Sequence, residues 1–374
     1  MIAAPPEASL HAHRSRTLDA LRALAVLLVL GFHGGYLGGG LPQPLAIGMH
    51  VWNRIGWAGV DLFFVLSGFL VSGLLFREFK LHGRVQGGRF LARRGLKIYP
   101  AFYVYLAVVI ATLAASGVAI DLRTVLSEAL FVQNYGPRFL VHTWSLAVEE
   151  HFYLLVTLVV VAAGARVANR RSVSIACLAI AVGALVARVV ASLRFGVTSH
   201  LHDATQFRID ALTAGLFLAY LYQFEPAAFR RLASRRAALA VAGVILIIPA
   251  VLLRFDDPWL GTVGLTTTYA AFAALLLLAV DREPTTRLLG PTVAALAVIG
   301  RYSYSMYLWH LPVRIAMLWA ARRVPAFPAT GGLGFVTFVA LSVVVGILMA
   351  KAVELPVLRL RDRYFPSRTG LPTG

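Results

Sequence analysis

Runs of about 20 apolar residues recur along the whole chain, and they constrain the fold more than any other feature. A helix needs roughly 20 apolar residues to cross the ~30 Å hydrocarbon core of a bilayer. Hydrophobic residues make up 59% of the chain and charged residues only 14%, well below the quarter or so that is usual in soluble domains. The sequence therefore predicts an all-α, polytopic membrane helical bundle with about ten transmembrane helices, at residues 18–39, 55–76, 98–117, 145–165, 172–192, 207–223, 237–253, 260–280, 293–320 and 331–353.

The net charge of +18 is distributed unevenly between the connecting segments. If the N-terminus is cytoplasmic, the inside segments hold 22 of the 35 Lys and Arg residues and the outside loops hold seven. The positive-inside rule describes this asymmetry, so the sequence predicts an N-in/C-in topology and needs no nucleic-acid partner. The Ala-, Arg- and Val-rich, Lys-poor composition indicates a GC-rich bacterial genome, and we expect a multi-pass protein of the inner (plasma) membrane, surrounded by lipids.

The connecting segments are too short for a second globular domain. We expect a cytoplasmic N-terminal tail at 1–17, a single membrane domain at 18–356, and a basic cytoplasmic tail at 357–374 that can bind anionic lipid. The N-terminal tail has no separate apolar core or cleavage site, so we expect the first span itself to direct insertion.

Two ionisable residues, Arg22 and His33, interrupt the first apolar span. Eleven residues are close to three helical turns, so the two side chains share a face and lie about 16 Å apart along the helix. Ionisable residues inside a membrane are functional candidates by default, and an imidazole is the usual general base near neutral pH. The alternative is structural, with His33 bonded to a neighbouring helix and Arg22 extended to the interface.

Three cations, Arg93, Arg94 and Lys97, stand at the cytoplasmic start of the third span. Arg94 and Lys97 are three residues apart and face the same way on a helix, where they can bind phosphates. They can equally be an ordinary positive-inside flank.

Carboxylates lie inside two other spans. Asp61 is surrounded by aromatic and small residues and needs a partner, for which His33, Arg208 and a helix N-terminus are candidates, in either a catalytic or a helix-pairing role. Glu149 can orient His33, as the carboxylate does in base-orienting triads, and one of Glu149 and Glu150 can simply be solvated. A metal site at His142, Glu149, Glu150 and His151 is disfavoured because the spacing is not His-Glu-x-x-His.

Further polar residues follow in later spans. Arg208 and Asp210 open the sixth predicted span, and the ninth contains Tyr304 and His310. The tyrosines there fit an aromatic belt or a binding wall, whereas we expect a functional role for His310.

Seven segments occur in a characteristic order: Arg22 with His33, GVDLFFVLSGFL at 59–70, RRGLKIYP at 93–100, TWSLAVEEHFY at 143–153, FRIDAL at 207–212, YSYSMYLWHLPV at 302–313, and Glu354-Leu355-Pro356. Together they resemble the acyltransferase-3 family of multi-pass membrane O-acyltransferases, which acylate sugars of lipopolysaccharide, exopolysaccharides and secreted metabolites. In that family the Arg-to-His motif and the basic motif are implicated in donor use and catalysis. Lys97 departs from the usual Arg, which keeps the charge but loses the bidentate geometry.

The resemblance and the residues lead to one hypothesis. An acyl-CoA, most often acetyl-CoA in similar proteins, would bind through its phosphates, and its pantetheine arm would bring the thioester to His33, which acts as general base or as a transient acyl carrier. No metal is expected. The donor site would comprise Arg22, Arg93, Arg94 and Lys97, the catalytic group His33, Glu149, Asp61 and His310, and the acceptor-binding group Trp144, Arg208, Asp210 and Tyr304.

The acceptor would enter from the opposite face, between loops 118–144 and 193–206, where His200, His202 and Asp203 offer polar contacts. It is a cell-envelope carbohydrate or, alternatively, a macrolide-type secondary metabolite. A different class remains as the competing interpretation, namely a transporter or flippase whose buried charges form a proton or substrate relay. The sequence shows no duplicated halves, which argues against that class.

Overall fold

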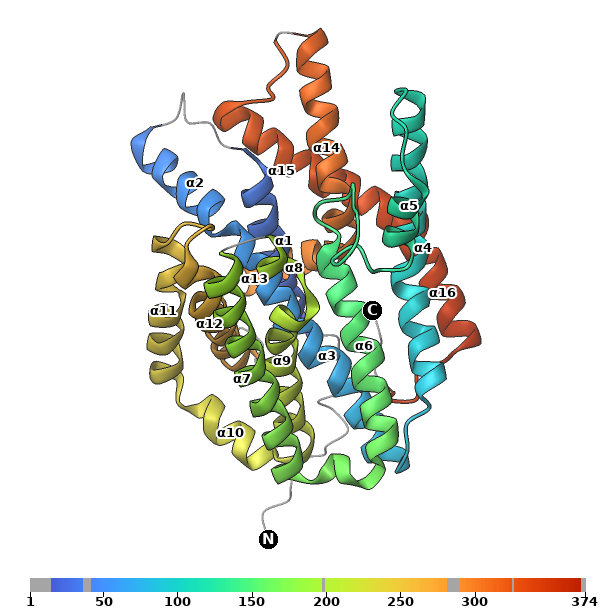
Figure 1. Cartoon of the computed structure of the whole chain (residues 1–374), viewed down its shortest axis with the longest axis vertical. Coiled ribbons are helices and arrows are strands. Elements are labelled where there is room, and N and C mark those ends of the chain that lie inside the picture. The colour runs from blue at the N-terminus through green and yellow to red at the C-terminus, as the bar shows by residue number, and fades with distance from the viewer. Residues whose placement is uncertain (1–14, 36–41, 197–198, 281–288, 325, 371–374) are drawn as a thin grey trace.

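The structure is a computed structural model that describes residues 15–35, 42–196, 199–280, 289–324 and 326–370; the side chains of residues 199, 200 and 289 lie outside the described ones. Every regular element in these ranges is helical (Figure 1), which confirms the predicted all-α class. The elements are α1 Arg16–His33, α2 Gln43–Ile55, η1 Gly56–Ala58, α3 Gly59–His82, α4 Gly87–Ala115, α5 Leu122–Ala129, α6 Trp144–Ala163, η2 Gly164–Ala168, α7 Arg170–Phe195, α8 Ser199–Asp203, α9 Thr205–Phe224, α10 Pro226–Ser234, α11 Arg236–Leu252, η3 Leu260–Gly264, α12 Leu265–Ala279, α13 Leu289–Arg301, α14 Ser303–Arg323, α15 Gly331–Met349, η4 Ala350–Glu354 and α16 Leu355–Tyr364.

Within the described residues, six helical stretches are long and apolar enough to cross a membrane, and a seventh counts if α10 and α11, bent by 74°, form one span. The six are 43–82, 87–115, 144–168, 170–195, 260–279 and 331–364. The predicted count of ten and the N-in/C-in orientation therefore stay predictions. The difference between the predicted count and the number of qualifying stretches lies mainly in α1, α9 and α14, which contain charged and polar residues and are therefore less apolar.

Two of the differences from the predicted spans concern which helices are present. The predicted span at 293–320 is two helices, α13 and α14, which meet at Tyr302. Residues 43–55, predicted as a connection, form the amphipathic helix α2, which contains no buried residue and precedes α3.

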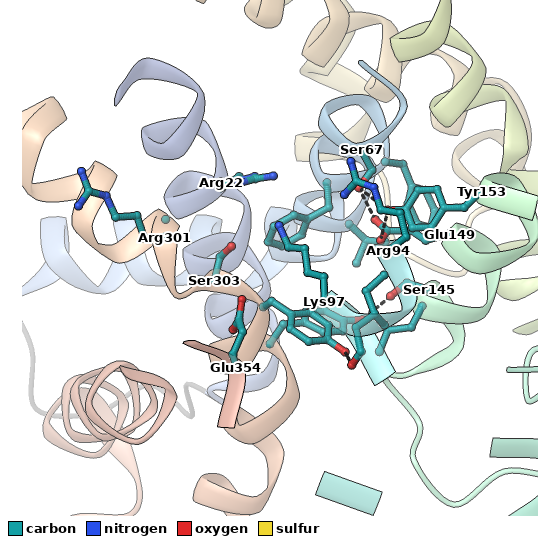
Figure 2. Close-up of a pocket in the computed structure, with 18 residues that line it drawn as sticks. Arg22, Ser67, Arg94, Lys97, Ser145, Glu149, Tyr153, Arg301, Ser303 and Glu354 are labelled. Carbon is teal, nitrogen blue, oxygen red and sulfur yellow. Dashed lines mark hydrogen bonds between the residues drawn. The ribbon is translucent and has the colours of Figure 1, made fainter. Parts of the chain in front are cut away.

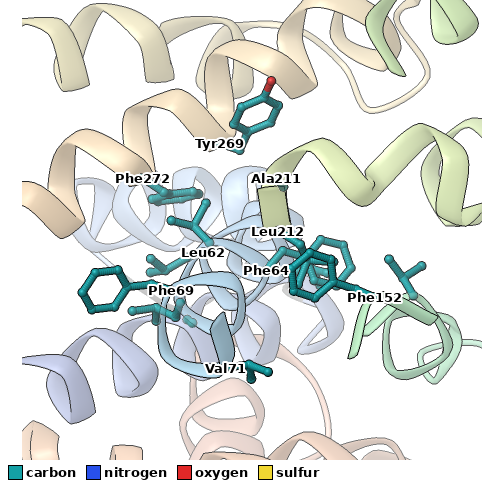
Figure 3. Close-up of a cluster of buried hydrophobic side chains, with 14 of the residues drawn as sticks. Leu62, Phe64, Phe69, Val71, Phe152, Ala211, Leu212, Tyr269 and Phe272 are labelled. Atoms are coloured by element: carbon teal, nitrogen blue, oxygen red, sulfur yellow. The ribbon is translucent and has the colours of Figure 1, made fainter. Parts of the chain in front are cut away.

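Helix α3 lies at the centre of the bundle. Its side chains pack against α6, α9 and α12 at once, as Figure 3 shows for Leu62, Phe64 and Phe69 with Phe152, Leu212 and Phe272. A helix that is apolar all round belongs in the interior, and α3 has buried residues on all its faces.

Two glycines allow α3 and α9 to touch along their backbones. A Cβ added to Gly68 would lie 1.9 Å from the carbonyl oxygen of Leu212, and one added to Gly215 would lie 2.1 Å from that of Val65. Small residues at helix contacts are typical of membrane bundles. The close contact fixes Asp61 and Ser67 of α3 relative to α9.

Candidate active site

A cavity of about 100 Å³ lies between α1, α3, α4, α6, α13, α14 and η4 (Figure 2). Its charged and polar lining comes from helices far apart in the sequence. Figure 2 shows Arg22, Arg94 and Lys97 on one side and Ser303 and Glu354 on another. The remaining polar lining residues are Ser67, Ser145, Glu149, Tyr153, Arg301, Tyr304 and Tyr307.

The cations of the cavity come from α1, α4 and α13. Arg22 Nη1 lies 3.5 Å from Asp19 Oδ1, one turn earlier on α1. Arg94 is held over the rings of Phe90 and Tyr153, at 5.7 and 5.8 Å from their centroids. In the part of the chain that the structure describes, no carboxylate forms an ion pair with Arg94, so this guanidinium can bind an anion in the cavity.

The structure gives Glu149 partners other than His33. Ser67 donates to Glu149 Oε1 at 2.8 Å, and the Tyr153 hydroxyl donates to Oε2 at 2.8 Å. The Tyr153 hydroxyl also lies 3.1 Å from Ser67 Oγ. Glu149 thus balances the charge of the cavity and holds the wall that carries Arg94.

The opposite wall is formed by α14 and η4. Tyr304 donates to the carbonyl oxygen of Ile98 at 2.8 Å, and Ser305 donates to Glu354 Oε2 at 2.9 Å. The π-helical turn η4 brings Glu354 to the cavity, and such turns are frequent at functional sites.

His33 and His310 form a hydrogen-bonded pair on α1 and α14. His310 Nδ1 lies 2.7 Å from the carbonyl oxygen of Tyr307, which can only accept, so Nδ1 carries the proton. In a neutral His310, Nε2 then accepts from His33 Nδ1 at 3.2 Å, while Val29 O lies 3.1 Å from the same Nδ1. The lone pair of His33 is left on Nε2, which has no hydrogen-bond partner among the described residues.

Helix α2 holds the end of α1 that carries His33. Trp52 Nε1 donates to Leu27 O at 2.8 Å, and Asn53 Nδ2 donates to Gly31 O and Phe32 O at 2.9 and 3.1 Å. The last carbonyls of a helix have no partner within it, so these bonds fix the backbone beside His33. Trp52 and Asn53 were missed in the sequence, where the amphipathic pattern after Pro42 was the available signal.

Tyr307 stands between the cavity and the histidines. Its hydroxyl donates to the carbonyl oxygen of His142 at 2.5 Å and lies 2.6 Å from Ser145 Oγ. Its ring lines the cavity, while its centroid is 5.8 Å from that of His310 and 5.5 Å from that of His142. His33 and His310 are not lining residues of this cavity.

Several predicted site residues lie away from the cavity. Arg93 faces α16, where its Nη2 lies 3.1 Å from Asp362 Oδ1. Asp61 accepts from Arg208 Nη2 at 2.8 Å, which confirms one of its three candidate partners. Arg208 lies over the ring of Trp144, 5.4 Å from its centroid.

A second buried ion pair accounts for Asp210. Arg188 Nη2 lies 2.7 Å from Asp210 Oδ2 and also donates to Thr266 Oγ1 at 2.7 Å, while its Nη1 donates to the carbonyl oxygen of Phe207. Both charged side chains are almost completely buried, with 0% and 1% exposed. The structure thus surrounds Asp210 with protein groups.

The remaining polar candidates lie at the end of the bundle that carries α8. Asp203 Oδ2 is paired with Arg138 at 2.5 Å, and His202 stacks on Phe255 with centroids 4.1 Å apart. Burial lowers the pKa of His202 to about 3.

His151 Nδ1 contacts Thr205 Oγ1 at 2.7 Å, and Tyr99 donates to Glu150 at 2.9 Å. The predicted contact of His200 lies outside the described side chains.

Comparison with known sequences matches residues 16–351 to the family described as "Acyltransferase domain". The chain belongs to this acyltransferase family. It is 27% identical over 319 residues to O-acetyltransferase OatA of Staphylococcus aureus strain NCTC 8325, covering 79% of this chain and 50% of the relative. It is 28% identical over 324 residues to peptidoglycan O-acetyltransferase OatA of Listeria monocytogenes, covering 79% and 49%.

The chain spans about half the length of these relatives. No solved structure matches it. Family membership confirms the resemblance based on the seven segments. The apolar helices of the structure and this membership identify a multi-pass membrane protein of the acyltransferase family.

Proposed function

We propose that this protein is an O-acetyltransferase that moves an acetyl group from cytoplasmic acetyl-CoA to a hydroxyl of a cell-envelope carbohydrate. One observation carries the proposal: α1 presents Arg22 to a cation-rich cavity and, eleven residues later, presents His33, whose Nε2 has no hydrogen-bond partner among the described residues. The two relatives named above are O-acetyltransferases, one of peptidoglycan. This favours a carbohydrate acceptor over a macrolide-type metabolite.

The donor would bind with its diphosphate between Arg22, Arg94 and Lys97. Phosphate and guanidinium groups form strong charge-assisted hydrogen bonds, and among the described residues no carboxylate forms an ion pair with Arg94 that a phosphate would have to displace. The rise of about 16 Å from Arg22 to His33 is of the right order for a pantetheine arm. That arm would pass the ring of Tyr307, so donor binding requires this side chain to turn aside.

Transfer would use His33 as the general base. Its Nε2 takes the proton of the acceptor hydroxyl while the hydroxyl oxygen attacks the thioester carbonyl carbon. The carbon–sulfur bond breaks, the thiolate of CoA takes the proton from the imidazolium, and the products are the acetyl ester and CoA. The bond from His33 Nδ1 to His310 Nε2 orients the ring and supports its positive charge.

The acceptor would reach His33 from the face opposite to the donor. His202, Asp203 and the turn before α6 lie at that end of the bundle. With the N-in/C-in topology the donor face is cytoplasmic and the acceptor face is outside the inner (plasma) membrane. The domain limits of 18–356 with tails at 1–17 and 357–374 belong to this proposal.

The test measures release of CoA and formation of labelled ester by protein in lipid nanodiscs, with radiolabelled acetyl-CoA and peptidoglycan fragments. General acid–base groups contribute about 10²- to 10⁴-fold, so His33→Ala should lower kcat by at least about 100-fold. His50→Ala is the matched control, because His50 is an exposed histidine on α2. Wild-type turnover in His33→Ala would refute the assignment of the base.

A further inference from the structure

The C-terminal segment that follows the cavity is docked against the ends of α3 and α4. Arg368 Nε lies 3.3 Å from Glu78 Oε1 on α3. Arg89 of α4 donates to the carbonyl oxygen of Pro366 at 2.8 Å, and its guanidinium lies over the ring of Phe365. Residues 365–368 are therefore in contact with α3 and α4.

One arginine of α16 is turned inward. Arg361 is 3% exposed, whereas Arg359 and Arg363 of the same helix are exposed. Arg361 Nη2 lies 2.8 Å from Asp362 Oδ1, the same oxygen that Arg93 Nη2 approaches at 3.1 Å. Two guanidinium groups thus share one oxygen of a half-exposed carboxylate.

This arginine pair adjoins the donor cavity. Arg361 lies close enough to Arg93 and to Arg94 for their like charges to repel each other. Arg94 lines the cavity, and so does Glu354, which immediately precedes α16. Arg361 and Arg93 converge on one carboxylate oxygen of Asp362, and a phosphate can take the place of that carboxylate between them.

CoA carries two separate phosphate groups that can meet these cations. Its diphosphate links the pantetheine arm to the ribose, and a phosphate monoester is attached to the ribose 3′-oxygen a few ångströms further from the thioester. Arg22, Arg94 and Lys97 can hold the diphosphate inside the cavity. Arg361 and Arg93 are not lining residues of the cavity, and they would hold the monoester beside it.

We propose that Arg361, together with Arg93, forms a second subsite that binds the 3′-phosphate of the CoA donor. The subsite rests on the proposed function, because it assumes that the donor is an acyl-CoA. Asp362, with 54% of its side chain exposed, turns into water when the phosphate takes its place. The C-terminal helix thereby makes the enzyme selective for CoA over its 3′-dephospho form.

The experiment compares KM for acetyl-CoA and for 3′-dephospho-acetyl-CoA in phosphatidylcholine nanodiscs. One charge-assisted hydrogen bond to the 3′-phosphate should make the KM of the wild type about tenfold lower for acetyl-CoA than for its 3′-dephospho form, a ratio equivalent to about 1.4 kcal/mol. Arg361→Gln should remove that preference by raising KM for acetyl-CoA alone. Arg359→Gln, the exposed control on the same helix, should keep it.

Each other outcome is decisive. Equal KM values for the two donors in the wild type would overturn the subsite while leaving the proposed function intact, and they do not depend on the folding of any variant. A loss in Arg361→Gln that is the same for both donors and varies with added phosphatidylglycerol would assign the arginines to a lipid headgroup. If the wild type transfers acetyl from neither donor, the proposed function itself fails.

Discussion

Arginines are buried in two regions of this bundle, and their surroundings differ. Between α3, α7, α9 and α12, Arg188 and Arg208 each meet an aspartate at 2.7–2.8 Å and are surrounded by protein atoms. In the cavity, Arg94 is supported by aromatic rings and faces open space. In the first region each arginine is neutralised by an aspartate, whereas in the second region the charge of Arg94 can interact with a ligand.

The difference separates structural from functional charges. A buried ion pair contributes little net stability, but removal of one partner leaves an unpaired charge in the interior. A cation beside a cavity can be removed at small cost to folding, and the effect then falls on the ligand. Asp61, Arg208 and Asp210, all predicted as site residues from the sequence, belong by geometry to the first region.

The largest effect on stability is expected for Arg208→Ala. This change leaves Asp61 buried without its partner and should cost about 3–5 kcal/mol of unfolding free energy. The measurement is thermal unfolding in detergent, together with the yield of monodisperse protein.

The matched change in the second region is Arg94→Ala. Loss of a charged hydrogen bond of about 1.5–3 kcal/mol should raise KM for acetyl-CoA about tenfold to a hundredfold, with a melting temperature close to that of the wild type. A melting temperature of Arg94→Ala as low as that of Arg208→Ala would contradict the distinction between the two regions.

A double substitution at Asp61 and Arg208 tests the same distinction between the two regions. Asp61→Leu combined with Arg208→Met replaces the ion pair by apolar side chains of similar size, a replacement that is often neutral or stabilising. The double variant should therefore recover most of the roughly 3–5 kcal/mol lost in Arg208→Ala, and it should retain acetyl transfer. Activity and melting temperature are measured on the same preparation of the double variant. A stable but inactive double variant would mean that Asp61 takes part in catalysis, as predicted from the sequence.

Local periodicity predicted the parts of the site that lie on one helix. The spacing of Arg22 and His33, and that of Arg94 and Lys97, follows from 3.6 residues per turn, and three of these residues line the cavity. The apolar pattern also predicted the all-α class. These features depend on the sequence of a single segment.

Long-range packing decided the rest. Arg93 and Arg94 are adjacent in sequence but point about 100° apart on α4, and only the position of α16 determines which of them faces the cavity. Glu149 bonds to Ser67 and Tyr153 because α3 and α6 meet at that level. The partners of His33 come from α14 and α2, which no spacing within α1 indicates.

The smallest expected effect concerns Glu128, a buried carboxyl that has no ion pair among the described residues. It accepts hydrogen bonds from the backbone N–H groups of Phe139 and Leu140 and from the Thr143 hydroxyl, at 3.3, 3.0 and 2.8 Å. It thereby holds the turn that contains His142. Burial raises the pKa of Glu128 to about 7, above its ordinary value of 4.5, so the folded protein binds this proton more tightly than the unfolded chain does.

The stability from that proton is fully present below pH 4.5 and is lost as the pH rises through about 7. Glu128→Gln keeps an acceptor for the two N–H groups and removes the titration. The melting temperature of the wild type should therefore fall between pH 5 and 8 by more than that of the variant, in the same detergent. Parallel pH profiles would mean that Glu128 is ionised throughout, as it would be if a cation compensated it in the way that Arg208 compensates Asp61.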